Sequence, residues 1–229
     1  MTIRPASDRS LLVTFGDVIS LDSHHQVFHL TRSLEGVRGI LNLHPAYASV
    51  LIEFDPRLVE SAAIEALIHQ KMASEADPRA AETPRTVEIP VRYGGEFGPD
   101  LDDVARHTGL SPERVVELHS AADYLVYFLG FAPGFAYLGG LPPELATPRI
   151  SAPRKHVPAG SVGIGGNQTG VYPIVSPGGW RLIGRTGVKL FDPSAAEPVL
   201  LRMGDRLRFV AEGSAGGLAA GVLPVNYAH

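Results

Sequence analysis

The residues most suited to chemistry lie in a cationic stretch that contains no acidic side chain. Residues 145–191 have no Asp and no Glu, although the whole chain has a formal net charge of −4. The cations of this stretch are Arg149, Arg154, Lys155, Arg181, Arg185 and Lys189. A local excess of positive charge attracts carboxylates, phosphates or the acidic surface of a partner. We therefore expect an anion-binding region within these residues.

Two of these cations, Arg181 and Arg185, are four residues apart in an expected strand. Side chains at that spacing point to the same face of a strand. A guanidinium group can bind a carboxylate or a phosphate through two parallel hydrogen bonds. Ligand binding is the favoured interpretation of this pair. An interface with an acidic partner and a plain solvated face are the alternatives.

Glycine and aromatic residues are concentrated in and just before the cationic stretch. Of the 25 glycines, 13 lie between Gly130 and Gly187. Glycine allows a backbone to approach a ligand closely and to turn where other residues cannot. Phe131, Phe135 and Tyr137 lie among these glycines, and they predict either a part of the core or the wall of a pocket.

The candidates for acid–base chemistry are two histidines, His119 and His156. Either could act as the base for a serine nucleophile, and Ser161 and Ser176 lie in Gly/Pro-rich segments. Neither serine is part of a Gly-x-Ser-x-Gly elbow. Serine-based hydrolysis is therefore not the favoured interpretation.

Nucleotide and metal motifs are weak in this sequence. There is no Gly-x-x-x-x-Gly-Lys-Ser/Thr loop, and after the Gly-Ile-Gly-Gly segment at 163–166 the third glycine of a dinucleotide fingerprint is replaced by Gln168. That segment is more typical of a strand end or a hairpin. His25 and His29 are four residues apart on an expected helix, but no third ligand is evident, so we expect no metal site.

The composition is that of an ordinary globular protein. Hydrophobic residues make up 45% of the 229 residues and charged residues 19%. The lack of cysteine excludes disulfides, thiolate metal sites and a cysteine nucleophile, and it is compatible with a cytoplasmic protein. The acidic net charge argues against nucleic-acid binding, and no apolar run reaches the roughly 18 residues of a membrane span. The opening residues, MTIRPASDRS, do not resemble a signal peptide.

The first part of the chain is predicted to alternate strands and helices. Strands are expected at residues 11–15, 37–43, 47–54 and 86–91, one helix between Ser20 and Gly36, and another around residues 64–72. The resulting order, β-α-β-β-α-β, is typical of the ferredoxin-like fold. We therefore predict a small α/β domain over residues 1–85.

The rest of the chain has a different pattern. Two short helices are expected at residues 101–107 and 112–121, and after residue 124 short apolar runs alternate with Gly/Pro turns. This spacing is typical of a compact β-barrel or sandwich. We predict a second domain over residues 86–212. Residues 213–229 are expected to form a tail that is poorly ordered or is ordered by a partner.

Three segments closely resemble a known family. They read YFLGFAPGFAYLGGL at 127–141, ATPRISAPRKHVPAGSVGIGGNQTGVYPIVSPGGWRLIGRT at 146–186, and KLFDP at 189–193. These motifs resemble the B subunit of the bacterial ATP-dependent 5-oxoprolinase, a family also called allophanate hydrolase subunit 1 or the sporulation-kinase inhibitor family. Its relative is one half of the carboxyltransferase domain of urea carboxylase. The likeness covers most of the chain beyond residue 88, and residues 44–56 support it.

The resemblance implies an α+β protein with a small ferredoxin-like α/β N-terminal domain and a cyclophilin-like β-barrel C-terminal domain. It implies a non-autonomous enzyme subunit that works with two others, a homologous C subunit plus a lactam-handling A subunit. The complex would convert 5-oxo-L-proline to L-glutamate, with ATP and Mg as co-substrates and no prosthetic group on this chain. Arginines and backbone amides would stabilise the anionic substrate and intermediate.

The residues and the resemblance together predict the members of the site. The catalytic candidates are Arg181, Arg185, His119 and His156. The substrate-binding candidates are Arg154, Lys155, Gln168, Tyr172, Gly178, Gly179 and Trp180. One departure from the family pattern is Gly187, which follows Arg185-Thr186 where we expect proline, and it loosens φ at that turn.

Two other functions stay open on the sequence. The chain could be an interaction protein that docks on a histidine kinase and inhibits it. It could also be half of a carboxyltransferase that acts on a biotin-carried carboxyl group. The sequence has no Met-Lys pair that would accept biotin, so any biotin would have to arrive on another protein.

Overall fold

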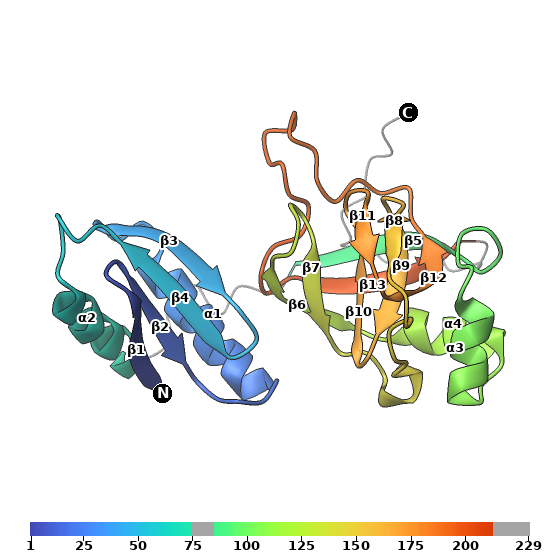
Figure 1. The fold of residues 1–229 in the computed structure, drawn as a ribbon, viewed down its shortest axis with the longest axis horizontal. Coiled ribbons are helices and arrows are strands. Elements are labelled where there is room, and N and C mark those ends of the chain that lie inside the picture. The colour runs from blue at the N-terminus through green and yellow to red at the C-terminus, as the bar shows by residue number, and fades with distance from the viewer. Residues whose placement is uncertain (75–84, 213–229) are drawn as a thin grey trace. The chain divides into compact units, whose positions relative to one another are not determined.

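The computed structural model describes residues 1–74 and 85–212. The chain divides into two compact units, Met1–Thr83 and Pro84–His229, each with a sheet and helices of its own (Figure 1). All residues predicted to carry chemistry belong to the second unit.

The first unit is a four-stranded antiparallel sheet with two helices against one face (Figure 1). Its elements are β1 (Thr2–Ser7), β2 (Ser10–Thr14), α1 (Leu21–Leu34), β3 (Ile40–Pro45), β4 (Ser49–Phe54) and α2 (Ser61–Ala73). The strands lie in the order β1-β2-β4-β3. On β4, buried Val50, Ile52 and Phe54 alternate with more exposed neighbours, so one face of the sheet forms the core.

Helix α1 begins where the sequence predicts. Ser20 accepts a hydrogen bond from the Ser23 amide at 3.1 Å, which satisfies one of the free amides of the first turn. Leu30 and Leu34 are fully buried, as their positions on one helix face predict. Gly36 follows the helix with a φ of 73°, a left-handed conformation that glycine adopts without strain.

The predicted ferredoxin-like order is not confirmed. Two strands precede α1 where one was expected, and the strand predicted at residues 86–91 belongs to the sheet of the second unit. β1 was missed because its residues are mostly exposed and include Pro5, so it lacks the alternation of a half-buried strand. An edge strand of this kind is defined by its pairing with β2 rather than by its own sequence.

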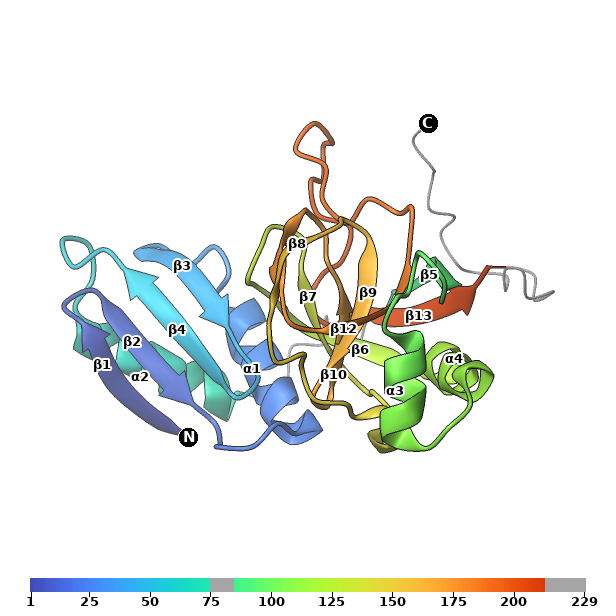
Figure 2. The ribbon, with the colours of Figure 1, turned by 45° about the vertical axis from the view of Figure 1, so that its right-hand side comes forward.

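The second unit is a nearly closed β-barrel with helices packed beside it (Figure 2). Its helices are α3 (Leu101–Thr108), α4 (Pro112–Ala121) and the short 3-10 helix η2 (Pro143–Leu145). Its strands are β5 (Thr86–Tyr93), β6 (Tyr124–Leu129), β7 (Ala136–Gly139), β8 (Arg154–Val157), β9 (Ser161–Gly165), β10 (Gln168–Val171), β11 (Ser176–Gly178), β12 (Arg181–Arg185) and β13 (Arg206–Ala211).

The main sheet of this unit has the strand order β10-β9-β12-β5-β13-β6-β7, and its end strands β10 and β7 pack against each other. β13 runs parallel to β5, and the other neighbours are antiparallel. β8 and β11 form a separate two-stranded sheet. The predicted barrel is thereby confirmed.

The core of the second unit lies inside the barrel. Ile89, Tyr124, Ile164 and Phe209 come from four different strands, and all are buried. Helix α4 packs against β13 and α3 packs against β12. Because β12 carries the predicted arginines, this packing brings the first turn of α3 close to the cationic stretch.

The two short helices predicted in this unit are confirmed. Ser111 caps α4 by accepting a hydrogen bond from the Arg114 amide at 3.2 Å, and Pro112 occupies the first turn. Within residues 1–74 and 85–212, no helix is long and apolar enough to cross a membrane. The predicted tail, residues 213–229, lies outside the described residues.

Candidate anion-binding site

Half of the cations in residues 145–191 are paired with carboxylates from outside that stretch. The pairs are Arg154 with Asp100, Arg181 with Asp103, and Lys189 with Asp192. The other three cations of the stretch, Arg149, Lys155 and Arg185, have no carboxylate partner among the residues that the structure describes. The folded protein is therefore less cationic here than its local composition predicts.

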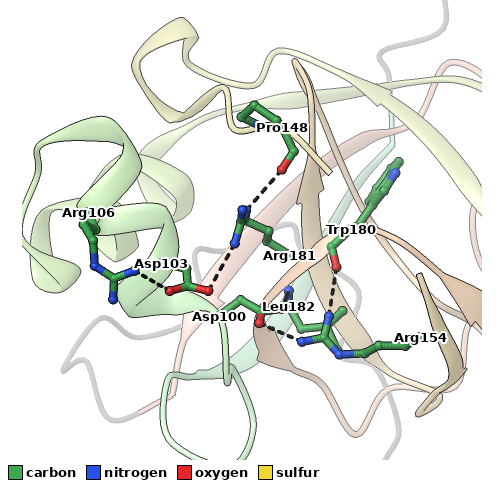
Figure 3. A network of polar contacts seen from close by, with 8 residues as sticks. All are labelled: Asp100, Asp103, Arg106, Pro148, Arg154, Trp180, Arg181 and Leu182. Atoms are coloured by element: carbon green, nitrogen blue, oxygen red, sulfur yellow. Dashed lines mark hydrogen bonds and ion pairs between the residues drawn. The ribbon is translucent and has the colours of Figure 1, made fainter. Parts of the chain in front are cut away.

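Asp100, just before α3, is buried and connects α3 to the barrel through Arg154 and Leu182 (Figure 3). We call these three residues the Asp100 clamp. Its Oδ1 accepts a hydrogen bond from Arg154 Nη2 at 2.7 Å, and its Oδ2 accepts one from the Leu182 amide at 2.7 Å. Arg154 also donates from Nη1 to the Trp180 carbonyl at 3.4 Å. The predicted ligand-binding Arg154 is thus committed to contacts within its own fold.

Arg181 is held by a second set of contacts on the same side of α3 (Figure 3). Its Nε donates to the Pro148 carbonyl at 3.1 Å and its Nη1 to Asp103 at 3.1 Å. Asp103 also accepts from Arg106 at 2.7 Å, and this bond, more than the charge of Arg181, lowers the pKa of the Asp103 carboxyl. The positive charge of Arg181 is therefore compensated in part, by a carboxylate that it shares with Arg106.

Arg185 has different neighbours from Arg181, although both belong to β12. The pairing of β12 with β9 shifts register between Leu182 and Gly184, which interrupts the simple alternation of side chains along the strand. The Arg185 guanidinium lies over the Phe97 ring, 5.9 Å from its centroid. The two arginines consequently share no partner among the contacts that the structure describes.

The predicted site residues Tyr172 and Trp180 are buried in an aromatic cluster with Phe135. The ring centroids lie 5.7 Å apart for Phe135–Trp180, 5.9 Å for Phe135–Tyr172 and 6.1 Å for Tyr172–Trp180. All three pairs have the edge-to-face geometry that aromatic rings prefer. Of the two interpretations that the sequence left open for Phe135, the core is the one observed.

The glycines of this region make room for those rings. A β-carbon at Gly178 would lie 2.4 Å from the Tyr172 hydroxyl, and one at Gly165 would lie 2.3 Å from Trp180 Cδ1. At Gly179 the nearest atoms, on Pro153 and Arg149, would be in ordinary contact. The density of glycine therefore reflects close packing of aromatic side chains against the backbone, which the sequence alone does not distinguish from close approach of a ligand.

Substituting Gly165 with alanine is expected to displace the Trp180 indole. The added methyl group overlaps the ring, so we expect a loss of about 1–3 kcal/mol in the free energy of unfolding. Trp180 is the single tryptophan, so its fluorescence should shift to the red as the ring becomes exposed. The control is Gly187→Ala, where the methyl group meets nothing within 4 Å. An unchanged emission spectrum in Gly165→Ala would contradict this packing.

Arg149 is an exposed cation beside the aromatic cluster. Burial raises the pKa of the Tyr172 phenol, whereas a hydrogen bond from the Trp180 backbone and the charges of Arg149 and Arg154 oppose that rise. Both guanidinium groups therefore lie near the phenol, and Arg149 is the more exposed of the two. The sequence identified Arg149 only as one cation among six, because nothing local distinguishes it.

His119 is fully buried and has a partner at each ring nitrogen. Nδ1 lies 2.8 Å from the Tyr93 hydroxyl, and Nε2 lies 2.8 Å from Thr169 Oγ1. Thr169 donates its own proton to the Gly163 carbonyl, so it accepts from Nε2, and Nδ1 accepts from Tyr93. Burial lowers the pKa of His119 from 6.5 to about 3. We therefore assign His119 to the core rather than to proton transfer.

The other predicted residues keep some exposed surface. Lys155 and His156 are exposed on β8, and Gln168 is half-buried at the start of β10. The hairpin expected at residues 163–166 is confirmed, since β9 pairs with β10 and places Gly165 opposite Gln168. Across the described ranges there is no group of three or more His, Cys, Asp or Glu side chains that could hold a metal ion.

Sequence reasoning missed the two acids that compensate the arginines. Asp100 is 54 residues from Arg154, and Asp103 is 78 residues from Arg181. The one local signal is the acidic first turn of an expected helix, which complements the positive end of the helix dipole. That signal predicts where the helix begins but does not predict which cations the acids contact.

The comparisons with known proteins agree with the fold and extend over nearly the whole chain. The family described as carboxyltransferase domain, subdomain C and D, matches residues 1–201. This chain belongs to that family. The B subunit of 5-oxoprolinase from Escherichia coli O157:H7 is 49% identical over 85% of this chain and 88% of its own length. The protein of the same name from Bacillus subtilis is 42% identical over 91% of each chain.

Other proteins that resemble this chain are larger. The urea amidolyase of Lachancea kluyveri is 27% identical over 91% of this chain, which corresponds to 13% of that protein. The crystal structure of TTHA0988 superposes with a TM-score of 0.80 at 38% identity over 94% of this chain. This chain spans 42% of the length of that structure.

Proposed function

We propose that this chain is the B subunit of an ATP-dependent 5-oxoprolinase. The observation that carries the proposal is the identity of 42–49% to proteins named as B subunits of 5-oxoprolinase, over at least 85% of this chain and 88% of each of those proteins. Because each match covers nearly the full length of both this chain and its relative, it favours the same subunit role rather than one shared domain. The chain is then one component of a cytoplasmic hydrolase complex.

The charge pattern is compatible with this reaction. A lactam amide is stable, so its hydrolysis to L-glutamate is helped when phosphate from ATP activates the amide oxygen. The substrate, the nucleotide and the intermediate are all anionic, and cations positioned beforehand stabilise such charge. In this proposal ATP and Mg are co-substrates of the complex. A homologous C subunit plus a lactam-handling A subunit would complete it.

The accessible basic residues of the barrel are the ones that we propose to face the substrate. Lys155, His156 and Arg185 keep exposed surface, and Arg149 joins them because it lies near the Tyr172 phenol. Gln168 and the backbone amides of Gly178 and Gly179 are the neutral donors of the proposed site. Of the remaining predicted residues, Arg154, Arg181, Tyr172 and Trp180 would position this surface, whereas His119 is part of the buried core.

Reconstitution tests the proposal directly. The chain would be purified alone and together with its two partner subunits, then supplied with 5-oxo-L-proline, ATP and magnesium, with glutamate and ADP followed over time. We expect glutamate only when all subunits are present, because the relatives that carry the proposal are named as one subunit of this enzyme. A well-assembled complex that releases no glutamate would contradict the assignment.

The second candidate function is carboxyl transfer from a biotin carrier. The similarity to urea amidolyase over 91% of this chain favours it as the alternative. The same purified assembly would be given a carboxylated biotin carrier and urea in a parallel reaction. Transfer of the carboxyl group without glutamate release would replace the 5-oxoprolinase assignment with this one.

A further inference from the structure

Two arginines face each other across neighbouring strands of the barrel. Arg185 on β12 is the register partner of Arg92 on β5. Their guanidinium groups lie over the same Phe97 ring, at 5.9 Å and 5.4 Å from its centroid. The ring face attracts each cation, but like charges directly opposite one another destabilise a sheet. The arrangement therefore favours an additional negative charge beside the pair.

The contacts of the folded chain give such a charge to Arg92 but not to Arg185. Arg92 Nε donates to the carboxylate of Glu212. Arg185 has no carboxylate partner among the described residues, and its Nε is buried without a hydrogen-bond partner there. A buried donor that stays unsatisfied is costly and rare in folded proteins. The Glu212 contact shows that a carboxylate fits beside Arg92, which is the register partner of Arg185.

A second buried polar atom without a partner lies next to Arg185. Ser161 on β9 is the register partner of Arg185 on its other side, so Ser161, Arg185 and Arg92 form one row across three strands. Ser161 is fully buried, and within the described ranges its Oγ has no hydrogen-bond partner. Register partners on antiparallel strands present their side chains to the same face. A hydroxyl beside a guanidinium is a suitable pair of donors for an oxyanion.

We propose that Arg185, flanked by Ser161 and Arg92, binds the carboxylate of a small-molecule ligand. The planar guanidinium offers parallel N–H donors that match the two oxygens of a carboxylate, and it lies over the Phe97 ring. This carboxylate site does not involve the Asp100 clamp. Naming 5-oxo-L-proline as the ligand rests on the proposed function, whereas binding of carboxylates as a class does not.

Calorimetric titration of the full chain tests the site. The probes are 5-oxo-L-proline, L-glutamate and inorganic phosphate. We expect Arg185→Gln to weaken the binding of both carboxylates about tenfold, because a charge-assisted hydrogen bond is lost. The matched control is Arg114→Gln, which removes the same charge from an exposed pair with Glu117 and should leave the affinities unchanged. Trp180 fluorescence verifies that each variant is folded.

Two further variants at or beside the row of Ser161, Arg185 and Arg92 should change the affinity for carboxylates in opposite directions. Glu212→Gln removes the carboxylate that compensates Arg92, so a bound anion meets less repulsion and its affinity should rise about threefold. Ser161→Ala keeps every charge but removes one donor, and it should weaken carboxylate binding about threefold. A purely structural role for these side chains would not produce the tighter binding in Glu212→Gln.

Several results would overturn the proposal. One is the absence of carboxylate binding by the wild-type chain, and another is an equal loss of affinity in Arg185→Gln and Arg114→Gln. If Arg185→Gln does not fold, Arg185→Lys and Glu212→Gln decide, and wild-type affinity in both overturns it. Tighter Arg185-dependent binding of phosphate than of carboxylates would overturn the ligand class. Binding of L-glutamate without 5-oxo-L-proline would support the site and count against the proposed substrate.

Discussion

Replacing Asp100 with alanine should lower the free energy of unfolding of the barrel unit by about 3–5 kcal/mol. The carboxylate is nearly inaccessible to solvent, and its removal leaves Arg154 Nη2 and the Leu182 amide without an acceptor and the Arg154 charge without a carboxylate partner. An uncompensated charge of this kind is far more costly than the loss of an exposed ion pair. Urea unfolding followed by the fluorescence of the single tryptophan, Trp180, measures the effect within this unit.

The matched control for Asp100→Ala is Glu117→Ala. Glu117 pairs with Arg114 at 2.7 Å on the exposed surface of α4, so its loss should change the free energy of unfolding by no more than about 1 kcal/mol. The double variant Asp100→Ala with Arg154→Met should be more stable than Asp100→Ala alone, because the unpaired charge is removed as well. Equal effects of the Asp100 and Glu117 substitutions would show that the clamp adds no particular stability.

The stability of the barrel unit should fall with acid because of His119. Its pKa is lowered by burial to about 3 in the folded protein, from 6.5. The unfolded chain therefore takes up a proton as the pH falls below 6.5, while the folded chain does not. The contribution of His119 to the free energy of unfolding is fully present well above pH 6.5 and declines toward pH 3. The decline approaches about 1.4 kcal/mol per pH unit, so about 2 kcal/mol is lost between pH 6.5 and 4.5.

The variant His119→Gln isolates this contribution because its side chain does not titrate. Urea unfolding of both proteins at several pH values gives two curves, and their difference removes the contribution of every other titrating group. We expect the wild type to be clearly more stable near pH 7 and the difference to shrink toward pH 4.5. The variant loses the stacking of His119 on Phe209, whose ring centroid lies 4.6 Å away, which adds a constant offset. Parallel curves would contradict a neutral His119.

Much of the second unit was predictable from local patterns. The alternation of short apolar runs with Gly/Pro turns predicted the barrel, and Ser111-Pro112 predicted the start of α4, since capping depends on neighbouring residues. The first unit was predicted less well. The exposed strand β1 does not alternate buried and exposed residues. Nothing in the sequence of residues 86–93 indicates which sheet this strand joins. Pairing between strands depends on distant residues, so single-strand patterns do not predict it.

In the candidate site, too, the sequence showed the local features but not the contacts between distant residues. The excess of cations in residues 145–191 is visible in the sequence, but its compensation is not, because Asp100 and Asp103 reach Arg154 and Arg181 only when α3 packs on β12. The sequence also did not separate a glycine that admits a ligand from Gly165, which admits the Trp180 ring.

The family, the presence of a barrel and the positions of the cations follow from the sequence alone, because motifs, periodicity and charge are properties of the chain as written. The folded structure was needed to show which cations are compensated, that His119 is neutral and buried, and that Arg185 and Arg92 stand opposite each other. Burial, hydrogen bonding and charge compensation depend on distances between residues far apart in the chain. Those distances exist only once the strands have paired and the helices have packed.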